Sequence, residues 1–122
     1  MTQPDKKLTV EIDSKDGVRF MALSGRIDHT NAAGFTADLE KLAKDLGSDE
    51  ALVIDFSDLA FITSAGLRAL FVLKKELDEA EKKFALTRLT GDVAEIFRIT
   101  GFDALIPTAK TTDEALTMIA PR

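Results

Sequence analysis

The sequence predicts an α/β fold in which a mixed, mostly parallel sheet has an antiparallel hairpin at its N-terminal edge and about four helices. The chain has 122 residues, of which 45% are hydrophobic, so it can bury one core without covalent cross-links. Stretches with the period of strands alternate with stretches that have the period of helices, which is typical of parallel strands joined by right-handed crossovers. No repeat, linker or low-complexity segment divides the sequence. We therefore expect one domain over 1–122, with its core over about 8–119.

Two strands are expected at the N-terminal end. From Leu8 to Ile12 apolar and polar residues alternate, which is the period of a half-buried strand. Asp16 and Gly17 form a favoured turn sequence, and a β-prone run over 18–24 follows them. These two strands should pair as an antiparallel hairpin.

Helices and strands alternate in the rest of the chain. We expect a helix from Thr30 or Asn31 to about Leu46, a strand over 51–56, a helix from Thr63 or Ser64 to about Lys82, a strand over 84–89, a short helix from Asp92 to Gly101, a strand over 105–106 and a last helix that starts with a capping box over 111–114. The nearly continuous apolar run over 51–56 indicates the centre of the sheet. The spacing by three and four predicts that the first two helices bury these residues: Phe35, Leu39, Leu42 and Leu46 on the first, and Leu67, Leu70, Leu73 and Leu77 on the second. Gly47 should close the first helix in the left-handed conformation, and the pairs Asp78/Lys82 and Glu79/Lys83 should form on the second.

The composition argues against several classes of protein. The chain has no cysteine, which excludes disulfides and thiolate metal sites and suits the reducing cytoplasm. Its net charge of −5, with basic and acidic residues mixed, disfavours nucleic-acid binding. No apolar run approaches the roughly 20 residues of a membrane-spanning helix. His29 is the only histidine, and no nucleophile is arranged with it, so we expect neither an enzyme nor a metal site or cofactor.

Candidate site residues lie in the loops that follow parallel strands, where open α/β sheets carry their sites. In this sequence the loops are 26–31, 55–64 and 88–92. The second loop ends with the hydroxyl residues Thr63 and Ser64 at the start of a helix. Capping of the helix would by itself explain a hydroxyl there. Gly66 in the first turn costs about 1 kcal/mol of helix propensity, which suggests that a kinase or a partner approaches Ser64 closely.

Four segments of the sequence match one known family. They are Leu23-Ser24-Gly25-Arg26-Ile27-Asp28, Leu52-Val53-Ile54-Asp55-Phe56-Ser57, Phe61-Ile62-Thr63-Ser64-Ala65-Gly66-Leu67 and Phe97-Arg98-Ile99-Thr100-Gly101-Phe102. With these segments the chain resembles a STAS domain of the anti-sigma factor antagonist type. In that family the serine at the position of Ser64 is the phosphoacceptor. Family members often have Asp before this serine and Ser after it; this chain has Thr63 and Ala65, which makes Thr63 a second candidate acceptor.

The resemblance implies an anti-sigma factor antagonist. When it is unmodified, such a protein binds an anti-sigma factor and so releases a sigma factor. The anti-sigma factor is a serine kinase of histidine-kinase-like fold. A serine phosphatase reverses the phosphorylation. ATP and metal ions would belong to these partners. Phosphate on Ser64 would add roughly −1.5 to −2 charges at a helix N-terminus, which favours anions, so the fold should persist while the surface changes. The expected contact residues are Asp28, His29, Thr30, Phe61, Thr63, Ser64, Gly66, Leu67 and Arg68.

Two other functions remain compatible with the sequence. The residues Thr63 and Ala65 also fit a STAS scaffold subunit, in a lipid-transport or stress-signalling assembly, that has no phosphate switch. A receiver-like domain that is phosphorylated on an aspartate is suggested by Asp55, which we expect at the end of the third strand, and by Lys110, which follows the last strand. A receiver needs a magnesium site built on acidic residues after the first strand, whereas Glu11 and Asp13 lie within a hairpin strand.

Several candidate residues have a simpler structural explanation. Asp55 is expected to cap neighbouring loop amides rather than to take part in chemistry. Arg68 belongs either to a solvated helix face, together with Lys74 and Lys75, or to the partner contact. Phe61 is either part of the core or an exposed apolar contact.

Overall fold

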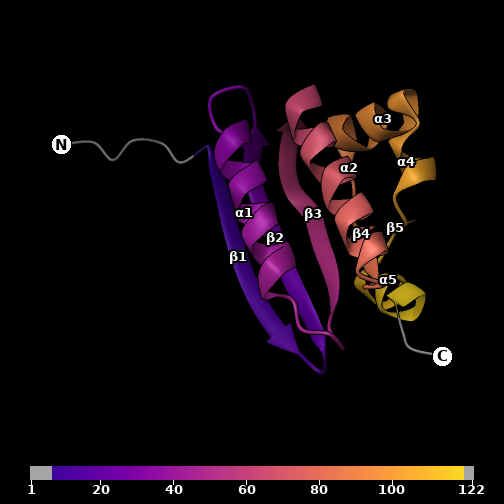
Figure 1. Cartoon of the computed structure of the whole chain (residues 1–122). Helices are drawn as coiled ribbons and strands as arrows, with labels where there is room; N and C mark the ends of the chain where they lie inside the picture. Colours follow the sequence, from indigo (N-terminus) through magenta and orange to yellow (C-terminus); the bar gives the residue numbers. More distant parts are fainter. Residues whose placement is uncertain (1–6, 120–122) are drawn as a thin grey trace.

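The computed structural model describes residues 7–119, which form five strands and five helices. In chain order they are β1 (Leu8–Lys15), β2 (Val18–Ile27), α1 (Ala32–Asp45), β3 (Ala51–Ile62), α2 (Ser64–Glu79), β4 (Phe84–Thr87), α3 (Gly91–Thr100), α4 (Phe102–Leu105), β5 (Thr108–Ala109) and α5 (Thr112–Ile119). The strands form one sheet in the order β1-β2-β3-β4-β5 (Figure 1). Only the β1-β2 pair is antiparallel among the strand pairs described, which confirms the predicted fold class.

The hairpin forms where the sequence predicts it. Asp16 and Gly17 have φ angles of 53° and 81°, and the flanking residues Lys15 and Val18 pair directly. Two consecutive residues with positive φ give the turn a twist that matches the twist of antiparallel strands. β1 is therefore held beside β2 along its whole length, from Leu8 to Lys15.

The sheet buries a core on each face. On one face α1 and α2 lie side by side (Figure 1) and pack, with α3, on the large apolar residues of β2 and β3. Its innermost side chains include Met21, Leu23, Phe35, Leu39, Leu52, Ile54, Phe56, Leu70, Leu73 and Phe97. On the other face α5 covers β3, β4 and β5 through a smaller cluster of Ala51, Val53, Ala85, Ala109, Ala115 and Ile119. The helix periodicity in the sequence identified the residues that face the sheet.

β3 is twice as long as the sequence indicated, at 12 residues instead of the six over 51–56. The β2-β3 pairing shifts register between Ala22 and Ser24 and again between Gly25 and Arg26. At each shift β3 has one residue more than β2, as in a β-bulge, and the two strands then pair again as far as Ile27 and Ile62. The polar residues after Phe56 predicted a loop, because the hydrogen bonds that keep this segment extended come from β2, which is distant in sequence.

Two predictions for the C-terminal third are wrong. The apolar pair at 105–106 is not a strand: Leu105 ends the short helix α4, and the fifth strand is Thr108–Ala109. Gly101, with φ at 79°, ends α3 and redirects the chain into α4, which gives five helices instead of four. Ile106 is fully buried, and this burial explains why the pair resembled a core strand.

Helix ends differ from the prediction in three places. Gly47 is not left-handed, because α1 ends with Leu46 in an extended conformation and Glu50 accepts a hydrogen bond from the Gly47 amide at 2.7 Å. α2 stops at Glu79, before Lys82 and Lys83, so the predicted pairs with these lysines do not form. Asp78 pairs with Lys74 instead. Asp92, expected to start the third helix, lies in the first turn of α3 behind Thr90. The capping box at 111–114 is confirmed in part: the Thr111 hydroxyl accepts from the Glu114 amide at 3.1 Å, whereas the Glu114 carboxylate accepts from the Lys110 amide at 3.3 Å and not from that of Thr111.

Candidate functional site

The candidate site lies at the carboxyl ends of β2 and β3. Ile27 and Ile62 pair at the end of the two strands, and the Thr63 amide donates a hydrogen bond to the Ile27 carbonyl at 3.0 Å. The loop 28–31 and the N-terminus of α2 therefore meet at one edge of the sheet, the upper edge in Figure 1. The predicted proximity of these two loops is a result of this pairing.

Thr63, not Ser64, caps α2. Thr63 has an extended backbone with φ −85° and ψ 169°, and its hydroxyl accepts a hydrogen bond from the Gly66 amide at 3.3 Å. Ser64 is the first helical residue and is exposed. Since another residue performs the capping that could have explained a serine here, the Ser64 hydroxyl is available for chemistry.

The sequence-based interpretation of Gly66 is wrong. Gly66 is buried and faces the sheet, so it does not uncover Ser64 toward solvent. A Cβ atom at this position would lie 2.7 Å from Cγ1 of Ile62 and 2.9 Å from Cγ2 of Ile27. The glycine lets α2 approach the ends of β2 and β3 closely. Leu67 also faces the core, so the burial of Gly66 and Leu67 removes both from the accessible surface of the site.

Gly66→Ala is expected to lower the free energy of unfolding by up to about 2 kcal/mol. Overpacking costs about 1–3 kcal/mol, and the better helix propensity of alanine returns about 1 kcal/mol of it. Urea unfolding would measure the change. Gly34→Ala is the matched control, because Gly34 is also helical but a Cβ atom there would meet nothing within 4 Å, so this variant should gain stability.

Asp28 organises the loop beside Ser64. Its carboxylate accepts hydrogen bonds from the Thr30 amide at 2.9 Å and the Thr30 hydroxyl at 2.6 Å. Its own amide donates to Asn31 Oδ1 at 2.8 Å, and its carbonyl oxygen accepts from the Ala32 amide at 3.0 Å. The turn into α1 is therefore held by Asp28 and Asn31 together, and not by a simple side-chain cap at the helix N-terminus.

Basic side chains complete this network. Lys7 and Arg26 approach Oδ2 of Asp28 at 3.4 Å and 3.6 Å. The Arg26 guanidinium also lies over the Phe61 ring, 5.2 Å from its centroid. Phe61 is half-buried, so it is neither a full member of the core nor a fully exposed apolar contact, the two alternatives left by the sequence. A cation over an aromatic ring is an attractive arrangement.

Asp28 should make stability depend on pH in the acid range. The hydrogen bonds from the Thr30 side chain and amide lower the pKa of Asp28 to about 2, with a smaller contribution from Lys7, from a usual value of 3.8. A folded-state pKa below the unfolded one stabilises the protein above about pH 4, and this contribution is lost as the pH falls toward 2. Thermal unfolding between pH 7 and pH 2 should show a weaker dependence for Asp28→Asn; an unchanged dependence would contradict the assignment.

Asp55 lies in the middle of β3 and forms an ion pair. Its carboxylate binds the Arg88 guanidinium at 2.5 Å and accepts from the Ser57 amide at 2.9 Å. Burial raises the pKa of Asp55, but the hydrogen bonds from Arg88 and Ser57 outweigh it and leave the pKa below its usual value. Asp55 does cap a nearby amide, as expected, but it does not end the strand, so the basis of the receiver-like hypothesis is wrong. The sequence did not reveal Arg88 as its partner.

The remaining site residues divide by exposure. His29, Thr30, Ser64 and Arg68 are exposed, and Thr63 is half-buried. No acidic residue lies in the first turn of α2, so an anion on Ser64 would meet the positive end of the helix dipole without a nearby carboxylate on the same turn.

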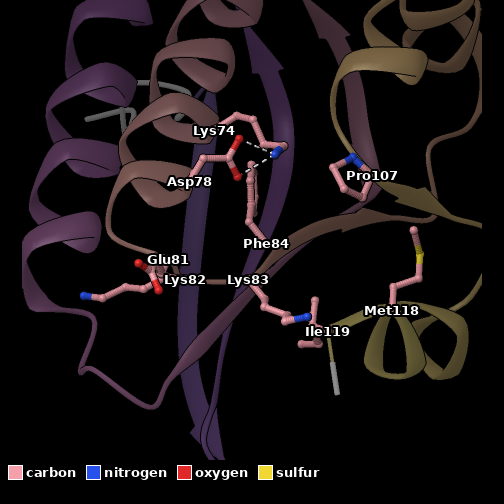
Figure 2. A pocket seen from close by; sticks show the side chains of 9 residues that line it. All are labelled: Lys74, Asp78, Glu81, Lys82, Lys83, Phe84, Pro107, Met118 and Ile119. Atoms are coloured by element: carbon pink, nitrogen blue, oxygen red, sulfur yellow. Dashed lines mark hydrogen bonds and ion pairs between the residues drawn. The ribbon is translucent and has the colours of Figure 1, made fainter. Parts of the chain in front are cut away.

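None of the four hollows described on the surface includes Ser64; the largest, of about 690 Å³, lies between the β1-β2 turn and α5. Figure 2 shows one of about 540 Å³ between the C-terminal half of α2 and α5, where the hydrogen-bonded pair Lys74 and Asp78 faces Met118 and Ile119. A shallow groove of about 640 Å³ between β1 and α1 does reach Lys7 and Thr30 in the Asp28 network. Among residues 7–119, no group of three or more His, Cys, Asp and Glu side chains could hold a metal ion. None of the helices described is long and apolar enough to span a bilayer.

Several known proteins are similar to this chain in sequence and fold. A model of the STAS domain family matches residues 9–115. A candidate anti-sigma factor antagonist, BtrV of Bordetella bronchiseptica, is 33% identical over 109 residues, which cover 89% of this chain and 90% of BtrV. The anti-sigma-F factor antagonist RsfB of Mycobacterium tuberculosis is 27% identical over 117 residues, covering 96% of this chain and 93% of RsfB. An anti-sigma factor antagonist from Mycobacterium paratuberculosis has a solved structure with a TM-score of 0.84 and 30% identity, covering 99% of this chain and 100% of that one. The chain belongs to the STAS domain family.

Proposed function

We propose that this protein is an anti-sigma factor antagonist whose binding is switched by phosphorylation of Ser64. The unmodified protein binds an anti-sigma factor, a serine kinase of histidine-kinase-like fold, and so frees a sigma factor. A serine phosphatase returns the modified protein to the binding form. The protein acts as one domain in the cytoplasm, where a chain without cysteines needs no oxidising environment.

The observation that carries the proposal is the division of roles between Thr63 and Ser64. Thr63 supplies the cap of α2 and is half-buried, whereas Ser64 is exposed beside it. A kinase can therefore modify Ser64 without removing the cap that starts the helix. The relatives described above, which carry the name of anti-sigma factor antagonists, support the choice of partner.

Phosphorylation would change the contact surface and leave the fold in place. A phosphate at the first residue of α2 lies next to unpaired helix amides and the positive end of the dipole, which stabilise it. A partner that covers the neutral hydroxyl would have to desolvate a charge of about −1.5 to −2 to cover the phosphate. Binding and phosphorylation therefore exclude each other.

The test of the phosphoacceptor uses purified components. Each anti-sigma factor of the source genome with a histidine-kinase-like fold is incubated with this protein and ATP, and the peptide containing Thr63 and Ser64 is analysed by mass spectrometry. We expect phosphate on Ser64, no phosphate in Ser64→Ala, and unchanged labelling in Thr63→Val. Phosphate on Thr63 alone would reassign the acceptor. Co-purification of the protein from its own cells with a large assembly, together with an unmodified peptide, would instead favour the scaffold function and leave Ser64 as a surface residue.

A further inference from the structure

The outward face of α2 continues from Ser64 as an apolar and basic strip. Arg68, Phe71, Val72 and Lys75 follow Ser64 at intervals that place them side by side on one face of the helix. Phe71 and Val72 are large hydrophobic residues with 37% and 40% of their surface exposed. α2 carries no acidic residue from its start to Lys75, although the chain has a net charge of −5. Apolar side chains between two cations are not expected on a purely solvated helix face.

α4 widens this strip. The ring of Phe102 lies against Phe71 with 6.3 Å between ring centroids and an interplanar angle of 63°. Phe102 in turn contacts the buried ring of Phe97 at 6.2 Å, which fixes it to the core. Leu105, one turn further along α4, is 52% exposed. The apolar surface therefore spans two helices and rests on a rigid aromatic support.

We propose that this α2-α4 strip, formed by Ser64, Arg68, Phe71, Val72, Lys75 and Phe102, is the docking surface for an acidic amphipathic helix of the anti-sigma factor. The inference rests on the proposed function and extends it beyond the phosphorylation site. Aromatic residues and arginine are enriched in the centres of protein interfaces. The two cations of the strip, Arg68 and Lys75, lie on either side of Phe71 and Val72 along α2 and complement a helix whose apolar side chains are flanked by aspartate and glutamate. From Ser64 to Lys75 the strip runs about 16 Å along α2, because the 11 steps between these residues rise about 1.5 Å each, and this length matches three turns of a partner helix.

The strip also explains how phosphorylation acts on the partner. Ser64 and Arg68 are one helical turn apart, so a phosphate on Ser64 lies within reach of the Arg68 guanidinium. The phosphate would neutralise a cation that the unmodified protein offers to the partner's carboxylates. It would also repel those carboxylates directly.

The test measures the Kd of the anti-sigma factor that phosphorylates or binds this protein in the assay above. Phe71→Ser and the double variant Arg68→Glu, Lys75→Glu should each raise the Kd at least tenfold. Added salt should weaken binding of the wild type, whereas it should strengthen binding of the double variant. Ile12→Ser and Lys44→Glu are matched controls, because these residues are exposed on β1 and on the last turn of α1, away from the strip; they should leave the Kd unchanged. Thermal unfolding of each variant checks that the fold persists.

The outcomes separate this inference from the function on which it rests. Wild-type affinity in the strip variants, together with loss of binding in Ser64→Glu, would overturn the docking surface and leave the phosphorylation switch intact. A change in self-association in place of a change in Kd would assign the strip to a second copy of the chain and overturn the inference. If no anti-sigma factor binds the unmodified wild-type protein, both the function and the docking surface are wrong.

Discussion

Gly25→Ala is expected to destabilise this protein by about 2–5 kcal/mol, because two separate penalties fall on one residue. Gly25 has φ at 105°, a conformation that residues with a side chain rarely adopt. A Cβ atom there would also lie 2.1 Å from the backbone oxygen of Lys7, which cannot move away as a flexible side chain could. The Lys7 oxygen accepts a hydrogen bond from the Arg26 amide, so the clash would displace the start of β1.

Two controls separate the conformational penalty from the clash. Gly101 has φ at 79°, and a Cβ atom would meet nothing within 4 Å, so Gly101→Ala should cost only about 1–2 kcal/mol. Gly34→Ala, with neither penalty, should be at least as stable as the wild type. Denaturant unfolding would measure all three free energies. Equal losses for Gly25→Ala and Gly101→Ala would show that the contact with Lys7 has no energetic importance.

Displacement of Lys7 should reach the site as well as the fold. Lys7 approaches the Asp28 carboxylate, and Arg26 follows Gly25 directly and lies between Asp28 and Phe61. The Gly25→Ala variant should therefore have a lower affinity for the partner than the wild type, even at temperatures at which the variant is folded. Binding equal to that of the wild type under those conditions would show that the network around Asp28 is not needed for the contact.

Ser64→Glu is expected to abolish partner binding while it preserves the fold. An acidic side chain in the first turn of α2 should stabilise the helix by about 0.3–1 kcal/mol through the dipole. In the complex the same carboxylate would be desolvated and would compete with the partner's acidic groups for Arg68, at a cost of about 2–5 kcal/mol, which corresponds to at least a thirtyfold rise in Kd. Titration calorimetry with the anti-sigma factor, together with thermal unfolding, would measure both effects.

Ser64→Ala distinguishes the charge from the loss of the hydroxyl. Alanine is neutral and favourable in a helix, so this variant should bind the anti-sigma factor with nearly wild-type affinity and resist phosphorylation. Equal loss of binding in Ser64→Ala and Ser64→Glu would mean that the hydroxyl itself makes the contact, and the charge-based switch would be wrong. Loss of stability in Ser64→Glu would contradict the exposed first-turn position.

The sequence by itself determined the elements whose residues carry a local signal. The alternation from Leu8 to Ile12 and the Asp16-Gly17 turn specified the hairpin, and the leucine spacing in α1 and α2 specified which side of each helix is buried. The order of strands and helices also specified that the loops near Asp28 and Ser64 follow the carboxyl ends of strands, and the family resemblance implied that the loop of Asp28 lies beside Ser64. These features depend on the period of short segments and on chain connectivity, both of which are present in a linear sequence.

Only the tertiary structure decided features that depend on neighbours distant in sequence. It extended β3 to Ile62, because β2 supplies the pairing, and it turned Leu105 into the end of a helix. It assigned Gly66 to close packing, because the isoleucines that exclude a Cβ come from two separate strands. It joined Arg88 to Asp55 across 33 positions of the chain. Pairing, steric exclusion and ion-pair formation are set by distances between segments, and a sequence pattern contains no such distances.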